Sequence, residues 1–136
     1  MTDNEQEKTM NDHTPITDVM NIGVPVTDQD RALAFYTEKL GFETRRDVPL
    51  PQPGGRWIEV APAGATITLS LVQAREGVPA GIETGIRLAA RDAAAVRTAL
   101  QDRGVEVGEL LRWPGVPAMF AFHDDDGNGL EIVEAA

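Results

Sequence analysis

One stretch decides the fold of this chain: Phe122-His123-Asp124-Asp125-Asp126-Gly127-Asn128-Gly129-Leu130-Glu131-Ile132-Val133-Glu134. Its cluster of Asp, Gly and Asn lies between two apolar runs, which predicts a β-hairpin. On the second strand of that hairpin, alternation sends Leu130 and Ile132 to one face and Glu131 to the other. An acid on an otherwise apolar strand indicates either a solvated face or a cavity in which a carboxylate is useful.

The composition limits the classes of protein to which the chain can belong. It has 136 residues, of which 42% are hydrophobic and 25% charged, as in an ordinary globular domain. It has no cysteine, so a disulfide, a thiolate nucleophile or a cysteine-bound metal is excluded. No apolar run is long enough to cross a bilayer, and the polar start does not look like a secretory signal, so we expect a cytoplasmic protein. The formal net charge of -10 argues against nucleic acid and membranes as partners.

Residues 1–15 have little apolar content and no period, so we expect a disordered leader there and a single domain over residues 16–136. Within that domain, alternating and helical periods predict the order strand, helix, strand, strand, strand twice, over about residues 18–72 and 82–134. Helices are expected after Thr27 or Asp28 and after Asp92, each capped by a polar side chain and ended by a glycine. The expected strands are 18–26, 42–48, 56–61 and 65–72, with a loop at 49–55, and then 82–90, 105–111, 118–123 and 130–134.

The two halves align as an internal duplication. Asp92 takes the place of Asp28, and Gly104-Val105-Glu106 takes the place of Gly41-Phe42-Glu43. One helix covers only one face of a sheet, so each half leaves its other face open and the halves must combine to close a core. This pattern predicts an α+β fold.

The sheet face opposite the helices can be identified from alternation alone. Several expected strands place small or polar residues on that face, and such residues favour a concave, partly polar cavity over a flat solvated surface. The third strand leaves two possibilities open, since either Trp57 and Glu59 or their neighbours Ile58 and Val60 can point there. Among the other residues assigned to this face, the candidates for ligand binding are Asn21, Thr68, Ser70, Gly85, Arg87 and Glu131.

Four short motifs resemble a known family. They are Val24-Pro-Val-Thr-Asp28, Arg31-Ala-Leu-Ala-Phe-Tyr36, Leu40-Gly-Phe-Glu43 and Asp126-Gly-Asn128, the last followed by Glu131. Together they resemble the vicinal oxygen chelate superfamily, which includes glyoxalase I, extradiol dioxygenases, fosfomycin-resistance enzymes and bleomycin-resistance proteins. The resemblance covers about residues 18–134. It implies paired βαβββ modules that form a concave cleft, commonly in a homodimer.

The resemblance also implies where a divalent metal would be held. The positions that match are Asn21, Gly85, Thr68 or Ser70, and Glu131. Only Glu131 is a strong ligand, because Gly85 has no side chain and the others supply neutral oxygens. We therefore expect no resident metal or cofactor, with a divalent ion as the minor alternative.

Other signals are weighed against ordinary structural roles. The Asp-rich turn lacks the acids that an EF-hand needs, since Phe122 and Val133 stand at two of its ligand positions. His123 lies at the end of a strand beside three acids and is interpreted as a surface histidine rather than a catalytic base. Tyr36 has the helical spacing of a core residue. Trp57 and Trp113 fit either apolar packing or aromatic walls around a flat ligand.

These observations favour metal-independent binding of a small organic molecule, cationic or aromatic in character, over catalysis. One alternative is a metal-dependent lyase or dioxygenase built on Glu131 with Glu59 or His123. Another is a non-catalytic dimer whose cleft is vestigial. Arg87 could pair with Glu131 or Glu59, or bind an anionic group. The predicted ligand-binding residues are Asn21, Trp57, Glu59, Thr68, Ser70, Gly85, Arg87, Trp113 and Glu131.

Overall fold

The computed structural model describes residues 15–51 and 55–136 and folds each half of the chain into its own four-stranded sheet. The predicted leader lies outside the described residues, apart from Pro15, as does the middle of the predicted loop at 49–55. The expected α+β fold of two paired βαβββ modules is confirmed.

The first half forms a mixed sheet in the order β1-β4-β3-β2. β1 and β4 run parallel, and the other neighbours run antiparallel. The helix between β1 and β2 begins after Asp28. The Asp28 side chain caps the first turn of that helix by accepting a hydrogen bond from the Arg31 backbone N–H at 3.1 Å. The elements are β1 (Asn21–Val26), α2 (Gln29–Ala34), η1 (Phe35–Lys39), β2 (Glu43–Pro49), β3 (Arg56–Ala61) and β4 (Thr68–Gln73).

The second half repeats this arrangement in the order β5-β8-β7-β6. Asp92 caps its helix as Asp28 does in the first half, by accepting from the Ala95 backbone N–H at 3.0 Å. The predicted hairpin is present, with His123 paired to Gly129 at the turn. The elements are β5 (Glu83–Ala90), α3 (Ala93–Asp102), β6 (Glu106–Val107), β7 (Met119–His123) and β8 (Gly129–Glu134).

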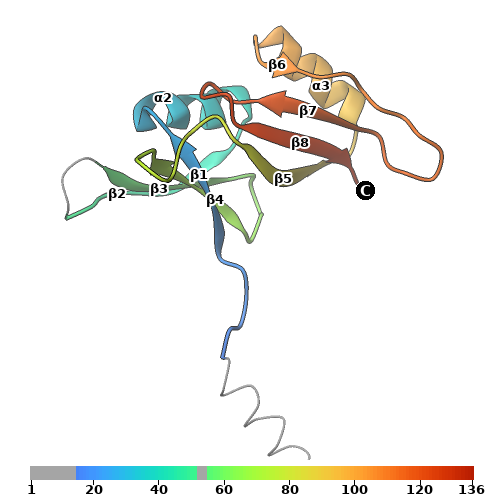
Figure 1. The fold of residues 1–136 in the computed structure, drawn as a ribbon. Coiled ribbons are helices and arrows are strands. Elements are labelled where there is room, and N and C mark those ends of the chain that lie inside the picture. Colours follow the sequence, from blue (N-terminus) through green and yellow to red (C-terminus); the bar gives the residue numbers. More distant parts are fainter. Residues whose placement is uncertain (1–14, 52–54) are drawn as a thin grey trace, which may run out of the picture.

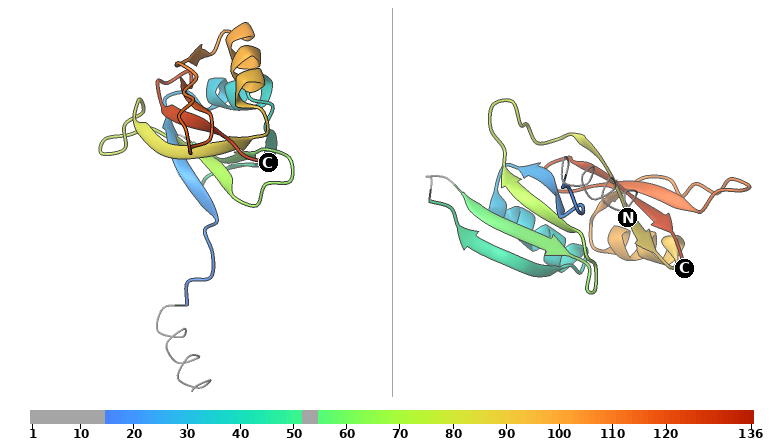
Figure 2. Two further views of the ribbon diagram at one scale, coloured as in Figure 1. Left: turned by 90° about the vertical axis from the view of Figure 1, so that its right-hand side faces the viewer. Right: turned by 90° about the horizontal axis from the view of Figure 1, so that it is seen from below.

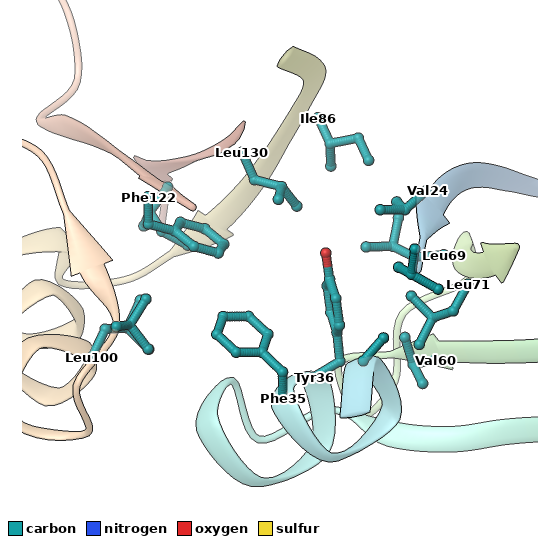
Figure 3. Packing of buried hydrophobic residues seen from close by; sticks show 14 of the residues in the cluster. Val24, Phe35, Tyr36, Val60, Leu69, Leu71, Ile86, Leu100, Phe122 and Leu130 are labelled. Carbon is teal, nitrogen blue, oxygen red and sulfur yellow. The ribbon is translucent and has the colours of Figure 1, made fainter. Parts of the chain in front are cut away.

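Both helices lie on the same side of the two sheets (Figure 1). The right-hand view of Figure 2 shows the sheets next to each other, each with its helix behind it. One apolar core runs through both halves and includes Val24, Leu71, Phe120 and Ile132. Phe35 and Tyr36 project from the first helix between the two sheets, toward Phe122 and Leu130 (Figure 3). The shared core makes the two halves one folding unit.

The first helix ends in a π-helical turn, which the sequence pattern did not predict. The backbone N–H of Leu40 donates to the Phe35 carbonyl at 3.3 Å, and that of Phe42 donates to the Tyr36 carbonyl at 3.0 Å. Phe35 and Tyr36 are neighbours in sequence, yet they are 3% and 0% exposed. The wider turn accommodates both aromatic rings in the core, and π-turns of this kind interrupt helices where local packing requires it.

Three expected strands differ from the observed ones by more than one residue at an end. β1 begins at Asn21 because residues 15–20 extend away from the body of the molecule (Figure 1). β4 begins at Thr68 because Ala65 donates to the Pro62 carbonyl in the preceding turn. β6 is only two residues long. The Gly108 N–H still donates to the Ala121 carbonyl at 2.7 Å, but the Gly108 carbonyl accepts from Arg97 Nε at 2.7 Å, and Leu111 forms an isolated bridge to Met119.

The hairpin turn between β7 and β8 links the two halves through Asn128, which is 0% exposed. Its side-chain oxygen accepts from the backbone N–H groups of Gly81 at 2.8 Å and Ile82 at 3.1 Å. Its amide donates to the Pro25 carbonyl in β1 at 2.8 Å and to Asp124 Oδ2 at 3.0 Å. A single buried amide therefore joins the first strand, the segment between the halves and the last hairpin.

Asp124 completes this junction. Its Oδ1 accepts from the backbone N–H groups of Asp126 and Asn128, both at 2.9 Å, and its Oδ2 accepts from the Tyr36 hydroxyl at 2.8 Å. Burial, and then the adjacent Asp124 carboxylate, raise the pKa of Tyr36, so the phenol stays protonated and donates. The acid-rich turn thus serves the fold, and Tyr36 has the structural role expected for it.

Candidate functional site

Burial shows which residues of the third expected strand, β3, face away from the core. Ile58 and Val60 are 1% and 0% exposed in the core, so Trp57 and Glu59 point to the opposite face of the first sheet. On that face β3 lies beside β4, where Ser70 is paired with Glu59 in register. The same face of β1 carries Asn21, which is paired with Thr68.

A pocket of about 860 Å³ opens on this concave face. Four of the predicted ligand-binding residues line it, and they come from three different strands. The lining residues are Asp18, Met20, Asn21, Arg45, Arg46, Trp57, Glu59 and Thr68.

Glu59 is held in place by two neutral donors. Trp57 Nε1 donates to its Oε2 at 2.6 Å, and Thr68 Oγ1 donates to its Oε1 at 2.8 Å. The bond from Trp57 lowers the pKa of Glu59 most, followed by the bond from Thr68, against a smaller rise from burial. Glu59 is therefore a carboxylate with a fixed position, and each of its oxygens retains capacity to accept a further hydrogen bond.

The positive groups near Glu59 are only partly available to it. Arg45 is engaged by Glu43 at 2.7 Å and by the carbonyls of Ala65 and Pro62, both at 2.9 Å. Arg46 lines the pocket, and its charge contributes to lowering the pKa of Glu59. Across residues 15–51 and 55–136, no basic side chain forms an ion pair with Glu59.

Ser70 lies beneath this pocket rather than on its wall. The residue is 1% exposed, and its hydroxyl oxygen has no hydrogen-bond partner among the described residues. Its partner in β1 is Gly23, where an added Cβ would meet nothing within 4 Å. The floor of the first concave face is therefore made of small side chains, as its sequence indicated.

The predicted residues of the second half form a separate group. Glu131 and Gly85 line a pocket of about 300 Å³ on the second sheet. Arg87 Nε donates to Glu131 Oε1 at 3.1 Å, which is one of the pairings that the sequence left open. The Arg87 and Glu131 side chains are 69% and 37% exposed, so the pair is largely solvated.

The structure leaves two aromatic candidates apart from these groups. Trp113 is 57% exposed in the loop before β7 and lines neither the pocket of Glu59 nor that of Glu131. His123 Nε2 lies 3.7 Å from Glu83, and its Nδ1 lies 4.0 Å from Glu106. His123 is therefore directed toward two exposed acids, one of which, Glu83, also lines the pocket of Glu131, whereas His123 itself does not line it.

Sequence reasoning missed several residues of the first pocket, notably Asp18, Met20, Arg45 and Arg46. Asp18 and Met20 were expected within the strand 18–26, where Met20 alternates with the core residues, but β1 begins only at Asn21 and both residues line the pocket. A register shift in β2 between Thr44 and Arg46 changes which side chains face the pocket, and no sequence signal announces that shift.

The residues at the positions implied for a metal do not fit a divalent ion. Thr68 is bound to Glu59, Glu131 is paired with Arg87, and Gly85 supplies no donor. In the part of the chain that the structure describes, no group of three His, Asp or Glu side chains could hold a metal ion together. The alternative ligand set of Glu131 with Glu59 or His123 is likewise dispersed, and metal independence remains a prediction.

Comparison with known proteins places this geometry in context. The family model of the Glyoxalase/Bleomycin resistance protein/Dioxygenase superfamily matches residues 18–132. The uncharacterized protein YetH of Bacillus subtilis (strain 168) is 32% identical over 117 residues, which are 83% of this chain and 94% of that protein.

Two solved structures are also similar. TnmS3, an antibiotic binding protein from Streptomyces sp. CB03234, is 36% identical with a TM-score of 0.78, over 89% of this chain and 98% of its own. A member of the same superfamily from Sphaerobacter thermophilus DSM 20745 is 33% identical with a TM-score of 0.81, over 88% and 98% of the two chains. Among the described residues, no helix has the length and apolar character needed to cross a membrane.

Proposed function

We propose that this chain, which belongs to the Glyoxalase/Bleomycin resistance protein/Dioxygenase superfamily, binds a small organic molecule against Glu59 on the concave face of its first sheet. The binding requires no metal, and the ligand is of the same broad class as that of TnmS3, an antibiotic binding protein. The predicted residues Asn21, Trp57 and Thr68 share this site.

The state of Glu59 is the observation that carries the proposal. Two donors orient its carboxylate, the lowered pKa keeps it ionised, and no ion pair within the described chain neutralises it. Arg46 lies opposite Glu59 in register but forms no ion pair with it, and an oriented carboxylate without an ion-pair partner favours a ligand group that supplies a positive charge or a strong donor.

The rest of the pocket favours a partly aromatic ligand. Trp57 presents a large flat surface beside the carboxylate, and aromatic rings stack on such surfaces at centroid separations of about 4.5–7 Å. Asn21 adds an amide that can donate and accept. The volume of about 860 Å³ falls in the range typical of small-molecule sites. We therefore infer an aromatic compound that carries an amine or another hydrogen-bond donor.

Tryptophan fluorescence tests this proposal directly. In a Trp113→Phe variant, Trp57 is the only tryptophan, so its emission reports on the pocket alone. A thermal-shift screen of cationic aromatic compounds would supply ligands, and a true ligand should change Trp57 emission saturably. The proposal fails if compounds that raise the melting temperature leave Trp57 emission unchanged, or if every hit loses its effect when metal is removed with EDTA.

We also expect a homodimer. Ile16, Val19 and Met20 precede β1 and are 86%, 56% and 78% exposed, which is unusual for apolar side chains so close together. A second copy would cover them. Light scattering at micromolar concentration should give twice the chain mass, and a monomer there would contradict this expectation.

A further inference from the structure

The apolar core is open at one end. Ile22 and Ile67 have the alternation of the core residues Val24 and Leu69, yet they are 37% and 42% exposed. Between them and the second half lies a cavity of about 460 Å³ that also touches Ile86 and Leu88 of β5. Ile22 and Ile67, which share the alternation of the core residues, therefore line a solvent-accessible cavity.

This cavity continues into a longer groove. A second apolar pocket, of about 210 Å³, reaches toward α3 and shares with the first the turn residues Pro62 and Ala63 and the β5 residues Leu88 and Ala89. We call the two together the β5 groove. β5 is an edge strand of its sheet, so no neighbouring strand of that sheet covers this side. Two adjoining cavities with mostly apolar lining residues suit a hydrocarbon chain or a narrow ring system.

A single charge belongs to this groove. Among the described residues that line its larger cavity, Arg87 alone is ionisable. Its Nε is occupied by Glu131 at 3.1 Å, whereas its terminal nitrogens Nη1 and Nη2 contact no acceptor in the described part of the chain. The bond to Glu131 fixes the direction of the guanidinium and leaves its outer edge available. Two parallel N–H groups on that edge match the two oxygens of a carboxylate.

We propose that the β5 groove is a second binding site, specific for a small amphiphilic carboxylate, with its apolar part along β5 and its carboxylate on Nη1 and Nη2 of Arg87. The site is separate from the Glu59 pocket and does not depend on the function proposed for it. No carboxylate lines the groove among the described residues, and the nearby Glu131 is already paired with Arg87, so the groove offers no acid to a cation. The formal net charge of -10 repels anions from most of the surface, so an anion needs a local positive group such as Arg87.

Three probes with the same hydrocarbon chain test the site: octanoate, 1-octanol and octylammonium, each titrated by calorimetry. Octanoate should bind saturably, one molecule per chain, and at least about tenfold more tightly than the other two, as expected for a charge-assisted pair of hydrogen bonds. Arg87→Gln should abolish that preference while leaving octanol binding unchanged. Glu131→Gln should strengthen octanoate binding several-fold, because it removes the competing negative charge and keeps an acceptor for Nε.

Two further variants separate the contributions of charge and shape. Arg112→Gln removes the same charge from an exposed loop residue and should leave octanoate binding unchanged. Ala63→Leu narrows the groove at an exposed turn and should weaken octanoate and octanol alike. Equal binding of octanoate to the wild type and to Arg87→Gln would overturn the proposal. So would absence of octanoate binding together with a dimer that Ile67→Asp dissociates, because a second copy would then cover the groove.

Discussion

The two halves of this molecule share one order of elements and differ in how each treats the acid on its concave face. Glu59 of the first half is held by the neutral donors Trp57 and Thr68. Glu131 of the second half is paired with Arg87. An acid fixed by neutral donors keeps its charge available to a ligand, whereas an ion pair satisfies the acid internally. The duplicated fold therefore has one concave face suited to binding and one whose acid has a partner already.

The hairpin turns of the two halves differ as well. The turn before β4 is apolar, and Pro62 and Ala63 leave a groove beside β5. The equivalent turn before β8 carries Asp124 and Asn128, whose buried side chains bridge to the first half. One turn leaves space between the halves and the other holds them together.

The strongest way to break this contrast is Asn128→Ala. The change removes four hydrogen bonds and leaves the buried Pro25 carbonyl and the half-buried backbone N–H groups of Gly81 and Ile82 without their partner. Buried groups left unsatisfied cost about 1–3 kcal/mol each, so we expect a loss of about 3 kcal/mol or more in the free energy of unfolding. Urea denaturation measures it. Asp125→Ala, at an exposed position of the same turn, should change stability by less than about 0.5 kcal/mol.

The charge of Glu59 should make a smaller, pH-dependent contribution to the free energy of unfolding than Asn128 does. Its pKa is lower in the folded chain than the value of about 4.3 typical of an unfolded one. Its contribution to stability is therefore fully present above about pH 4.3 and is lost as the pH falls through the lower folded value. Chemical denaturation of the wild type and of Glu59→Gln across that range should show the difference between them shrinking in acid. A difference that is constant with pH would mean that the charge of Glu59 is not held by Trp57 and Thr68.

The smallest effect is expected at the second acid. Glu131→Gln removes an ion pair whose side chains are 69% and 37% exposed, and such pairs contribute about 0–1 kcal/mol. We expect a change of no more than about 0.5 kcal/mol in the free energy of unfolding. A loss several times larger would show that the Arg87–Glu131 pair stabilises the fold. The second half would then depend on its acid for stability, contrary to the expectation.

The sequence predicted the architecture because each signal behind it is local. Alternation, the caps at Asp28 and Asp92 and the Asp-Gly-Asn turn depend on neighbouring residues, and the structure contains the elements that they indicate. Tertiary packing decided the rest. The π-turn at Phe35 and Tyr36 follows from fitting two adjacent rings into one core, which no helical period encodes.

The predicted site was one cleft, and the structure divides its residues between two faces. Asn21, Trp57, Glu59 and Thr68 share a pocket, whereas Gly85 and Glu131 line another. Alternation shows which side of a strand a residue occupies, but it does not show how two sheets are placed relative to each other. The roles of Asp124 and Asn128 were missed for the same reason, since their partners are distant in sequence.

A ligand titration tests the central claim most directly. With a cationic aromatic compound found by thermal shift, calorimetry on Glu59→Gln should show at least about a tenfold loss of affinity, because a charge-assisted hydrogen bond contributes about 1.5–3 kcal/mol. Glu131→Gln, an identical change on the other concave face, should alter affinity less than about twofold. A tenfold loss at Glu131 with none at Glu59 would contradict the account.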